Sequence, residues 1–351
     1  MYKDDLKDEN GQYNRLNFLK RAKTLIGWGW FRMFQKRELP EKNLLQTIWL
    51  YLDYLGCLFR YGAIVPDYYA YRFWEKKACL RKTYVTKKVS RAIQKELNLG
   101  GAKCFYSKLE FNKVFANYRC VEHFEFPGTL EGFVDFVRKS HYKILFKPIF
   151  GSSSAGIFIP DVSTNEKIRE LYEKYATEGE YFAEEYFVQT GPLADVNPSS
   201  VNTVRIYTVY DGKDIRIMNA CVRFGAPGSI VDNIHGGGMC CELDAEEGVV
   251  VGPGWDKECH RYIRHIATGK LVAGIRVPNW GRVLNMVKEA AMLHTEIGYV
   301  GWDIAVSEDR VHFIEANEQG NFNMPQRAMQ RGIKKDYEEV LKLRRRNLAK
   351  A

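Results

Sequence analysis

The spacing of apolar residues divides the chain into a helical first part and a strand-rich second part. From residue 142 onward, apolar and polar residues alternate with the two-residue period of β-strands. The expected strands cover residues 142–149, 156–160, 181–187, 201–210, 215–224 and 249–251, and a later pair covers 300–306 and 311–316. Helices are expected over 283–297 and 326–347. Strands therefore dominate the chain after residue 142.

Residues 1–100 contain many aromatic residues and few glycines, and their apolar residues have helical spacing. Such spacing is clearest at Leu16, Leu19, Ala22, Leu25 and Ile26. Aromatic and basic residues surround this segment, namely Lys20, Arg21, Lys23, Trp28, Trp30, Phe31, Arg32, Phe34, Lys36 and Arg37. The mixture is typical of an interfacial membrane helix. It is equally typical of a helix that packs on its own protein and exposes a basic face.

The most apolar stretch of the chain is residues 48–65. It contains Asp53 and Arg60, which favours a buried helix over a membrane span. The pair Gly100-Gly101 marks a boundary, after which helices are expected over 105–115 and 130–140.

Composition excludes some classes of protein and leaves others open. The 351 residues are 46% apolar and 14% aromatic, which predicts a folded chain of about two domains. The formal charge of +9 suits an anionic ligand, an anionic membrane or nucleic acid and selects none of them. The eight cysteines form no CxxC pair, so free thiols in a reducing compartment are expected. The charged opening MYKDDLKDENGQ lacks the apolar core of a secretory leader.

The stretch FKPIFGSSSAGIFIP, residues 146–160, carries a lysine at the end of an apolar run and then a loop of glycine and serine. Such a loop between two strands lets backbone N–H groups approach a polyanion without steric conflict. Lys147 would add a positive charge. An ordinary hairpin loop has the same composition, so the loop alone does not decide the matter.

A second polar group is predicted in GWDIAVSEDRVHFIEANEQGNFN, residues 301–323. Residues two apart on a strand face the same side, so Glu315 and Asn317 are expected to point together. A turn over 307–309 would bring Asp303 beside them. Three oxygen ligands on one strand pair suit Mg²⁺ when phosphate oxygens and water complete its coordination.

Five segments in order resemble those of ATP-grasp proteins, and most of all the sugar-transfer-associated ATP-grasp family. They are SKLEFNKVF, KPIFGSSSAGI, YFAEEYF, SSVNTVRIYTV, and GWD together with FIEAN, spread over roughly residues 100–330. The resemblance implies an α+β ATP-grasp fold, in which two α+β subdomains clamp ATP between their sheets. It also implies four parts: a helical region 1–100, nucleotide and metal/substrate subdomains 101–188 and 189–330, and a basic helix 331–351.

The resemblance also assigns roles to residues. It implies nucleotide binding by Lys108, Lys147, Gly151, Ser152, Ser153, Ser154, Gly156, Glu184, Glu185 and Phe187. Glu184 is expected to meet the adenine amino group, with backbone near Glu185 and Phe187 at the ring edge. The catalytic set is Lys147, Asn202, Arg205 and His235, the last from the glycine-rich segment DNIHGGGMCCELDAEEG. The implied metal ligands are Asp303, Glu315 and Asn317.

Two features depart from the family pattern. Ser107 stands where many relatives have aspartate before the first lysine, and residues 1–100 lack the strand–glycine–helix rhythm of a Rossmann-like domain. The N-terminal region is therefore expected to be mainly helical.

The activity implied by the resemblance is an ATP- and Mg²⁺-dependent ligase, with Mn²⁺ as an alternative metal. It would join a carboxylate to an amine or a thiol through an acyl phosphate, in the synthesis or modification of surface polysaccharide. The substrates would be a small-molecule or glycan carboxylate and an amine acceptor. The expected location is cytoplasmic, with a peripheral position at an anionic membrane surface, and no nucleic-acid partner is expected. A kinase acting on a sugar hydroxyl and a basic peripheral-membrane binding protein are the alternatives.

Overall fold

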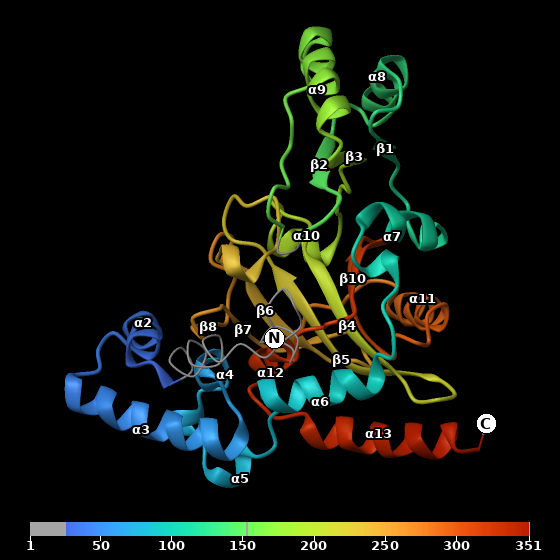
Figure 1. Ribbon diagram of the computed structural model, residues 1–351. Helices are drawn as coiled ribbons and strands as arrows, with labels where there is room; N and C mark the ends of the chain where they lie inside the picture. The colour runs from blue at the N-terminus through green and yellow to red at the C-terminus, as the bar shows by residue number, and fades with distance from the viewer. Residues whose placement is uncertain (1–25, 152–153, 351) are drawn as a thin grey trace, which may run out of the picture.

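A computed structural model describes residues 26–151 and 154–350 and contains two antiparallel sheets (Figure 1). The small sheet has the strand order β1-β3-β2 and the large sheet the order β10-β9-β4-β5-β6-β7-β8. In Figure 1 the small sheet and its helices form a narrow lobe that rises above the large sheet. Helices at the N-terminus form a further unit at the lower left.

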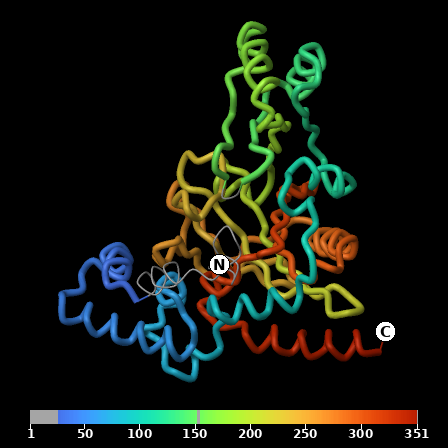
Figure 2. Tube along the Cα trace, viewed as in Figure 1, coloured from blue at the N-terminus to red at the C-terminus, as the bar shows by residue number. Residues whose placement is uncertain are grey.

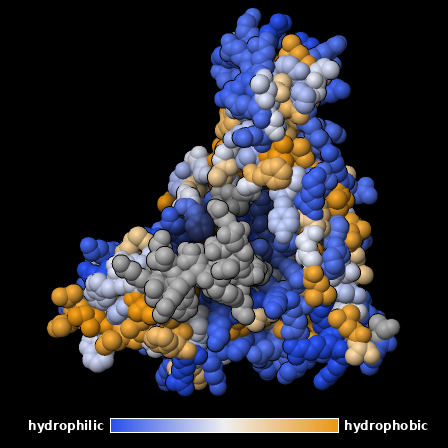
Figure 3. Space-filling model, in the orientation of Figure 1, coloured by the Kyte–Doolittle hydropathy of each residue, from blue (hydrophilic) through white to orange (hydrophobic). Residues whose placement is uncertain are grey.

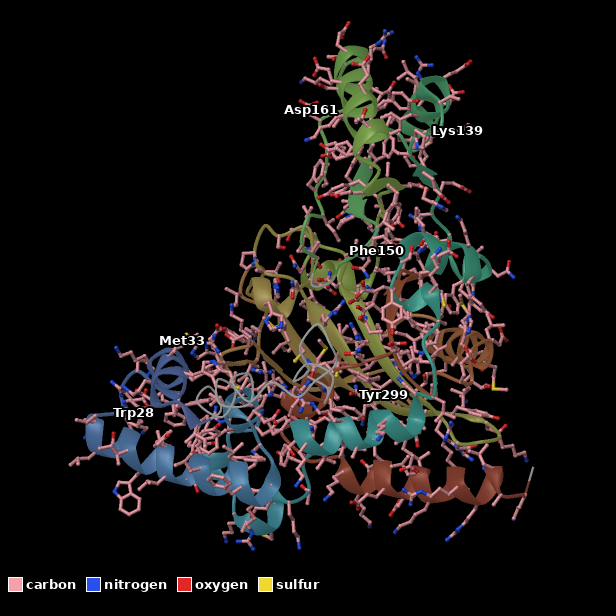
Figure 4. All side chains as sticks on the ribbon, in the orientation of Figure 1. Trp28, Met33, Lys139, Phe150, Asp161 and Tyr299 are labelled. Atoms are coloured by element: carbon pink, nitrogen blue, oxygen red, sulfur yellow. The ribbon has the colours of Figure 1, made fainter. Side chains whose placement is uncertain are left out.

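The small lobe is an α/β layer. Its strands are β1 (His123–Glu125), β2 (Ile144–Pro148) and β3 (Tyr181–Glu185), and its helices are α8 (Leu130–Lys139) and α9 (Asn165–Glu178). The helices pack Phe133 and Tyr175 against Phe146 and Ala183 of the sheet. The strand expected at 156–160 is wrong: within it, Phe158 makes a single bridge to Phe146. Figure 4 shows Lys139 and Asp161 toward the outer end of the lobe and Phe150 at its base.

The large sheet is buried on both faces. Its strands are β4 (Thr203–Tyr210), β5 (Ile215–Phe224), β6 (Met239–Leu243), β7 (Val250–Trp255), β8 (Arg261–Tyr262), β9 (Tyr299–Val306) and β10 (Val311–Asn317). Successive side chains along β4 point to opposite faces of the sheet, and each face is covered by a different helix. Ile206 packs in the core of α11 (Trp280–Met292), whereas Tyr207 packs in the core of α13 (Lys334–Leu348).

The large sheet, α11 and α13 form the body of the molecule together with three further helices. These helices are α7 (Lys108–Val114), α10 (Pro192–Val196) and α12 (Asn323–Met329). The single C-terminal helix expected over 326–347 is in fact α12 followed by α13. Gln330, in a left-handed conformation with φ 49°, ends α12. The expected strands at 215–224, 300–306 and 311–316 agree with β5, β9 and β10 to within one residue.

The N-terminal module, residues 26–100, is helical as predicted. Its helices are α2 (Trp28–Glu38), α3 (Leu44–Tyr61), α4 (Val65–Ala70), α5 (Ala78–Arg81) and α6 (Lys87–Leu97). Phe31 is fully buried and lies within 5.5 Å, between ring centroids, of Tyr54 and Tyr69. The module thus has an aromatic core of its own. The helical spacing predicted from Leu16 to Leu25 lies outside the described residues.

The module is attached to the body through α4, through the segment between α5 and α6, and through α6. Cys259 Sγ lies 3.3 Å from the carbonyl oxygen of Tyr69, and the Tyr84 hydroxyl donates to the carbonyl of Gln330 at 2.6 Å. Figure 2 shows α6 running alongside α13, where Arg345 pairs with Glu96 at 2.7 Å. In the described ranges, the structure contains no helix with the length and hydropathy that crossing a bilayer requires.

Candidate active site

A cavity of about 440 Å³ lies between the two sheets and brings most of the predicted site residues together. The predicted residues that line it are Lys108, Lys147, Ser154, Glu184, Phe187, Arg205, His235, Asp303, Glu315 and Asn317. The small sheet supplies two of them, the large sheet supplies four, and Pro66 of α4 reaches the cavity from the N-terminal module. Residues separated by more than two hundred positions therefore share one solvent-accessible space.

Lys147 is held by a buried ion-pair network. It lies on β2, is 7% exposed and donates to the Glu184 carboxylate of β3. Arg119 donates to the other oxygen of Glu184 at 2.5 Å and to the carbonyl of Phe313 at 2.8 Å. Burial alone would raise the pKa of Glu184, but Lys147 and Arg119 outweigh it and hold that pKa far below its ordinary value. With both oxygens paired to cations, Glu184 orients Lys147, and its contact with an adenine amino group stays a prediction.

An apolar wall adjoins this network. The Phe187 ring stacks on His312, with centroids 5.6 Å apart and planes at 23°, and Ile314 and Leu145 also line the cavity. Burial and then repulsion from Arg119 lower the pKa of His312 to about 3, so its imidazole is neutral. Its Nδ1 accepts a hydrogen bond from the backbone N–H of Cys120 at 3.1 Å. A flat, neutral, partly aromatic surface of this kind suits a base ring.

Lys108 reaches the same space from a helix end. Ser107 caps α7 by accepting from the backbone N–H of Glu110 at 3.4 Å, which gives the unusual serine a structural role. Lys108 Nζ donates to the carbonyl of Gly151 at 3.0 Å. Burial lowers the pKa of Lys108, and the attraction of Glu315 opposes that shift. Gly151 lines a small adjoining recess together with Lys108, Glu315 and Asn317.

The rest of the glycine–serine loop is only partly described. Ser154 lines the cavity, whereas Ser152 and Ser153 lie outside the described residues. Gly156 has φ 77°, a left-handed conformation that strains any other residue, and a Cβ there would also displace the Tyr181 hydroxyl, which lies 2.9 Å away. Gly156 does not line the cavity, which makes it a shaping residue of the loop.

Strand register sets the charged floor of the cavity. Arg205 on β4 lies opposite Asp303 on β9, and Asp303 lies opposite Glu315 on β10. Arg205 binds Asp303 through Nε and Nη2, the latter at 2.6 Å. Arg223 of β5 adds a contact to Asp303 at 3.1 Å. Burial alone would raise the pKa of Asp303, but these two guanidinium groups hold it below its ordinary value.

Glu315 has the opposite electrostatic environment. Burial, followed by repulsion from Asp303, raises its pKa, and the Asn317 amide donates to Glu315 Oε1 at 3.1 Å. In residues 26–151 and 154–350 no three His, Cys, Asp or Glu side chains form a metal-binding group. Two carboxylates and the amide oxygen of Asn317 nevertheless form a hard-oxygen set that fits Mg²⁺. A buried carboxylate with a raised pKa is also one that a bound cation would stabilise.

Two predicted residues, Asn202 and Glu185, lie outside the cavity lining, and a third, His235, lines it from an exposed turn. Asn202 is fully buried and outside the cavity lining, and its amide donates to carbonyl oxygens of Leu193, Asn197 and Ser200. These bonds give Asn202 a structural role, and its assignment as catalytic stays a prediction. Glu185 is also outside the lining, and its backbone N–H already donates to the carbonyl of Glu122 at 2.9 Å. His235 lines the cavity from an exposed turn, and burial, then Lys257, lowers its pKa.

Sequence reasoning missed Arg119, Arg223, Asp232 and His312. Arg223 donates to Thr203 Oγ1 at 2.7 Å and contacts Asp232 at 3.2 Å, so it links the floor to the loop before the glycines. The sequence contained a recognisable pattern for two of these four residues. Arg223 and His312 are polar residues inside otherwise apolar strands, which is the pattern that had singled out Asp303.

Solved structures with a similar arrangement include several ligases. The ATP-grasp ligase PsnB, in a complex with a phosphomimetic variant of its minimal precursor, Mg and ADP, is 12% identical, with a TM-score of 0.43; the match covers 68% of this chain and 59% of PsnB. The D-cycloserine synthetase DcsG is 11% identical, with a TM-score of 0.41 and coverages of 71% and 70%. The D-alanine-D-alanine ligase from Coxiella burnetii is 10% identical, with a TM-score of 0.41 and coverages of 70% and 58%.

The chain thus spans less than two thirds of the length of PsnB. No curated protein matches it. The sequence pattern of the family described as sugar-transfer associated ATP-grasp matches residues 103–342, which is more than half of the chain. The chain therefore belongs to the sugar-transfer associated ATP-grasp family.

Proposed function

We propose that this protein is an ATP-dependent ligase that joins a carboxylate to an amine, or to a thiol, through an acyl phosphate. The observation that carries the proposal is the cavity itself. Among the described residues, one space holds six cationic side chains beside the oxygen ligands Asp303, Glu315 and Asn317, and Lys108, Lys147 and Arg205 are the three of them that the sequence singled out. Family membership supports ATP as the nucleotide.

The proposed reaction has two steps. In the first, a substrate carboxylate oxygen attacks the γ-phosphorus, and the bond to the β–γ bridging oxygen breaks to give ADP. In the second, an amine attacks the acyl carbon, phosphate leaves, and the ammonium proton is lost to base. Both steps depend on positioning and charge neutralisation more than on a protein nucleophile.

The chain's own residues would divide this work. Lys147 is oriented by Glu184, so its position is fixed before the nucleotide binds. Lys108, at the start of α7, would face the phosphates from the loop side. Arg205 is fixed on Asp303 and would face the oxygens of the transferred phosphoryl group. Phe187 and His312 would exclude water from the base.

Asp303, Glu315 and Asn317 are the residues that would hold Mg²⁺. Bound there, the cation would neutralise charge on the phosphate oxygens. The Glu315 carboxylate is the donor with most to gain, because its pKa is raised and the Asp303 carboxylate is already neutralised by two arginines.

We further propose that the ligase acts in the synthesis or modification of a glycan or surface polysaccharide, at the cytoplasmic face of a membrane. The family description refers to sugar transfer, which supports the glycan part of this proposal. The experiment is a screen for ADP release with Mg²⁺ present, in which uronic acids and nucleotide sugars are combined with amines and amino acids. Release that needs both a carboxylate and an amine supports a ligase. Release that needs only a hydroxyl compound would instead indicate a kinase.

A further inference from the structure

Helix α3 presents an apolar face to solvent. Its exposed apolar residues are Leu44, Leu45, Ile48, Trp49, Leu52 and Phe59, of which Leu45, Trp49 and Phe59 are 72–73% exposed. At 100° per residue these positions fall on one side of the helix. The opposite side carries Tyr54, Cys57 and Leu58, which pack in the aromatic core of the module. The helix is therefore apolar on both sides, although only one is covered.

The polar residues of α3 lie at the borders of this face. Asp53 pairs with Arg81 of α5 at 2.6 Å and accepts from the Tyr68 hydroxyl at 2.9 Å. Arg60 stands in the last turn. Between Leu44 and Phe59, all of them described residues, the outward face carries no charged side chain. The sequence prediction for residues 48–65 was therefore partly right: α3 covers this stretch only as far as Tyr61, Gly62 in a left-handed conformation ends the helix, and only one side of α3 is buried.

Neighbouring elements extend the face. Trp28 of α2 packs edge-on against Tyr51 with centroids 5.0 Å apart and is 37% exposed, and Leu80 of α5 is 53% exposed. Figure 3 shows the result as an apolar patch at the lower left of the molecule, over α3. Figure 4 locates Trp28 at this end of the module. A continuous apolar patch of this kind indicates a surface that binds something.

The charge of the surrounding residues indicates what it binds. Residues 26–100 contain 14 Lys and Arg against 6 Asp and Glu, whereas residues 101–351 contain 32 against 33. Most of the net positive charge of the described chain is thus carried by the module. Exposed or half-exposed cations stand at the ends of α3 and on the helices beside it, namely Lys36, Lys42, Arg60, Lys77 and Lys82. Apolar side chains bordered by lysine and arginine match an anionic bilayer surface.

We propose that the outer face of α3 binds the module to an anionic phospholipid surface. The helix has 18 residues, so it is about 27 Å long, and it lies in the interface parallel to the bilayer with Trp49 and Phe59 among the acyl chains. This deepens the membrane location included in the proposed function by naming the surface and the lipid class. It does not depend on the reaction, because α3 does not line the cavity.

The test is co-sedimentation of the full chain with vesicles of phosphatidylcholine alone or mixed with phosphatidylglycerol, at low and high salt. We expect binding to the anionic vesicles that weakens with salt. In the variant Trp49→Glu/Phe59→Glu, the partition coefficient should fall at least about tenfold, because two large apolar side chains lose their burial. Leu293→Glu is the matched control, since Leu293 is 52% exposed on the body, and it should bind as the wild type does.

Calorimetric ATP titration and circular dichroism distinguish a loss of lipid binding from a loss of the nucleotide site or of the fold. ATP affinity and the spectrum should be unchanged in the α3 variant, so a failure to bind lipid would not be a failure of the nucleotide site. Absence of binding to anionic vesicles at low salt would overturn the proposal. An equal loss of vesicle binding in Leu293→Glu would also overturn it. Concentration-dependent self-association that the α3 variant abolishes would overturn it as well, because the face would then bind a second copy of the chain.

Discussion

The ATP-grasp body and the N-terminal module place charge and apolar surface in opposite ways. In the body, charged groups such as Arg205, Asp303 and Glu184 are each less than 10% exposed and are paired inside a cavity. In the module, the buried core is aromatic, while cations and the apolar face of α3 are outside. A reaction site needs charges held in fixed geometry away from water. A surface that meets a bilayer needs apolar and cationic groups that can reach it.

The comparison depends first on Glu315 having a chemical role rather than a structural one. Glu315→Ala should lower turnover at least about a thousandfold, the effect of losing a principal charge-stabilising group. Steady-state ADP release measures this, and circular dichroism should show a retained fold. Glu185→Ala, which changes a carboxylate outside the cavity, is the control and should stay near wild type. Near-normal turnover in Glu315→Ala would contradict the metal assignment.

The module is expected to depend on its inner aromatics and not on its outer ones. Phe31→Ala should lower the free energy of unfolding by about 3–5 kcal/mol, because it empties a fully buried ring site. Phe59→Ala, at a residue 73% exposed, should change it by less than about 0.5 kcal/mol. Denaturant unfolding of both variants provides the comparison. Equal losses would mean that α3 is covered in solution.

Lys147 tests whether the paired charges of the body are arranged for a ligand. Lys147→Ala should weaken ATP binding by about 1.5–3 kcal/mol, the range for a charge-assisted hydrogen bond. Calorimetry with Mg²⁺ present measures the loss. Arg119→Ala removes the other partner of Glu184 from a residue outside the cavity lining, so it should destabilise the fold more than it weakens binding. Unchanged ATP affinity in Lys147→Ala would reject the phosphate role.

The smallest expected effect is the pH dependence of cation binding. Because the pKa of Glu315 is raised, part of its population is protonated at pH values where an ordinary glutamate is ionised. A cation binds the ionised form, so affinity should rise with pH through the raised pKa, by less than about tenfold per unit. Metal titrations of the nucleotide complex at several pH values measure this slope. Glu315→Gln should flatten it, and an unchanged slope in that variant would assign the proton to another group.

Much of the fold was predictable because it depends on local periodicity. The strands at 215–224, 300–306 and 311–316 alternate cleanly, and the pairing of Asp303 with Glu315 follows from the short turn between their strands. The strand at 156–160 failed because an apolar run needs a partner strand, and only Phe158 finds one. The pairing of Glu184 with Arg119 joins residues 65 positions apart, and the hydrogen bonds of Asn202 to Leu193, Asn197 and Ser200 depend on how the preceding loop folds; neither is indicated by hydrophobic periodicity.

The outer face of α3 shows the other limit. Its apolar run predicted a helix, yet hydropathy alone does not say whether a core or a bilayer covers each side. The three-dimensional arrangement decides, since Tyr54 faces the module core while Trp49, five residues earlier, is 73% exposed.

The most direct test of the ligase proposal is ADP release measured with one carboxylate substrate, with and without an amine. We expect ADP and phosphate to form in equal amounts with a covalent carboxylate–amine product, and only when Mg²⁺ and both substrates are present. Glu315→Ala should abolish all three products together. Stoichiometric ADP with a stable phosphorylated hydroxyl compound, and no phosphate or amide, would contradict the proposal.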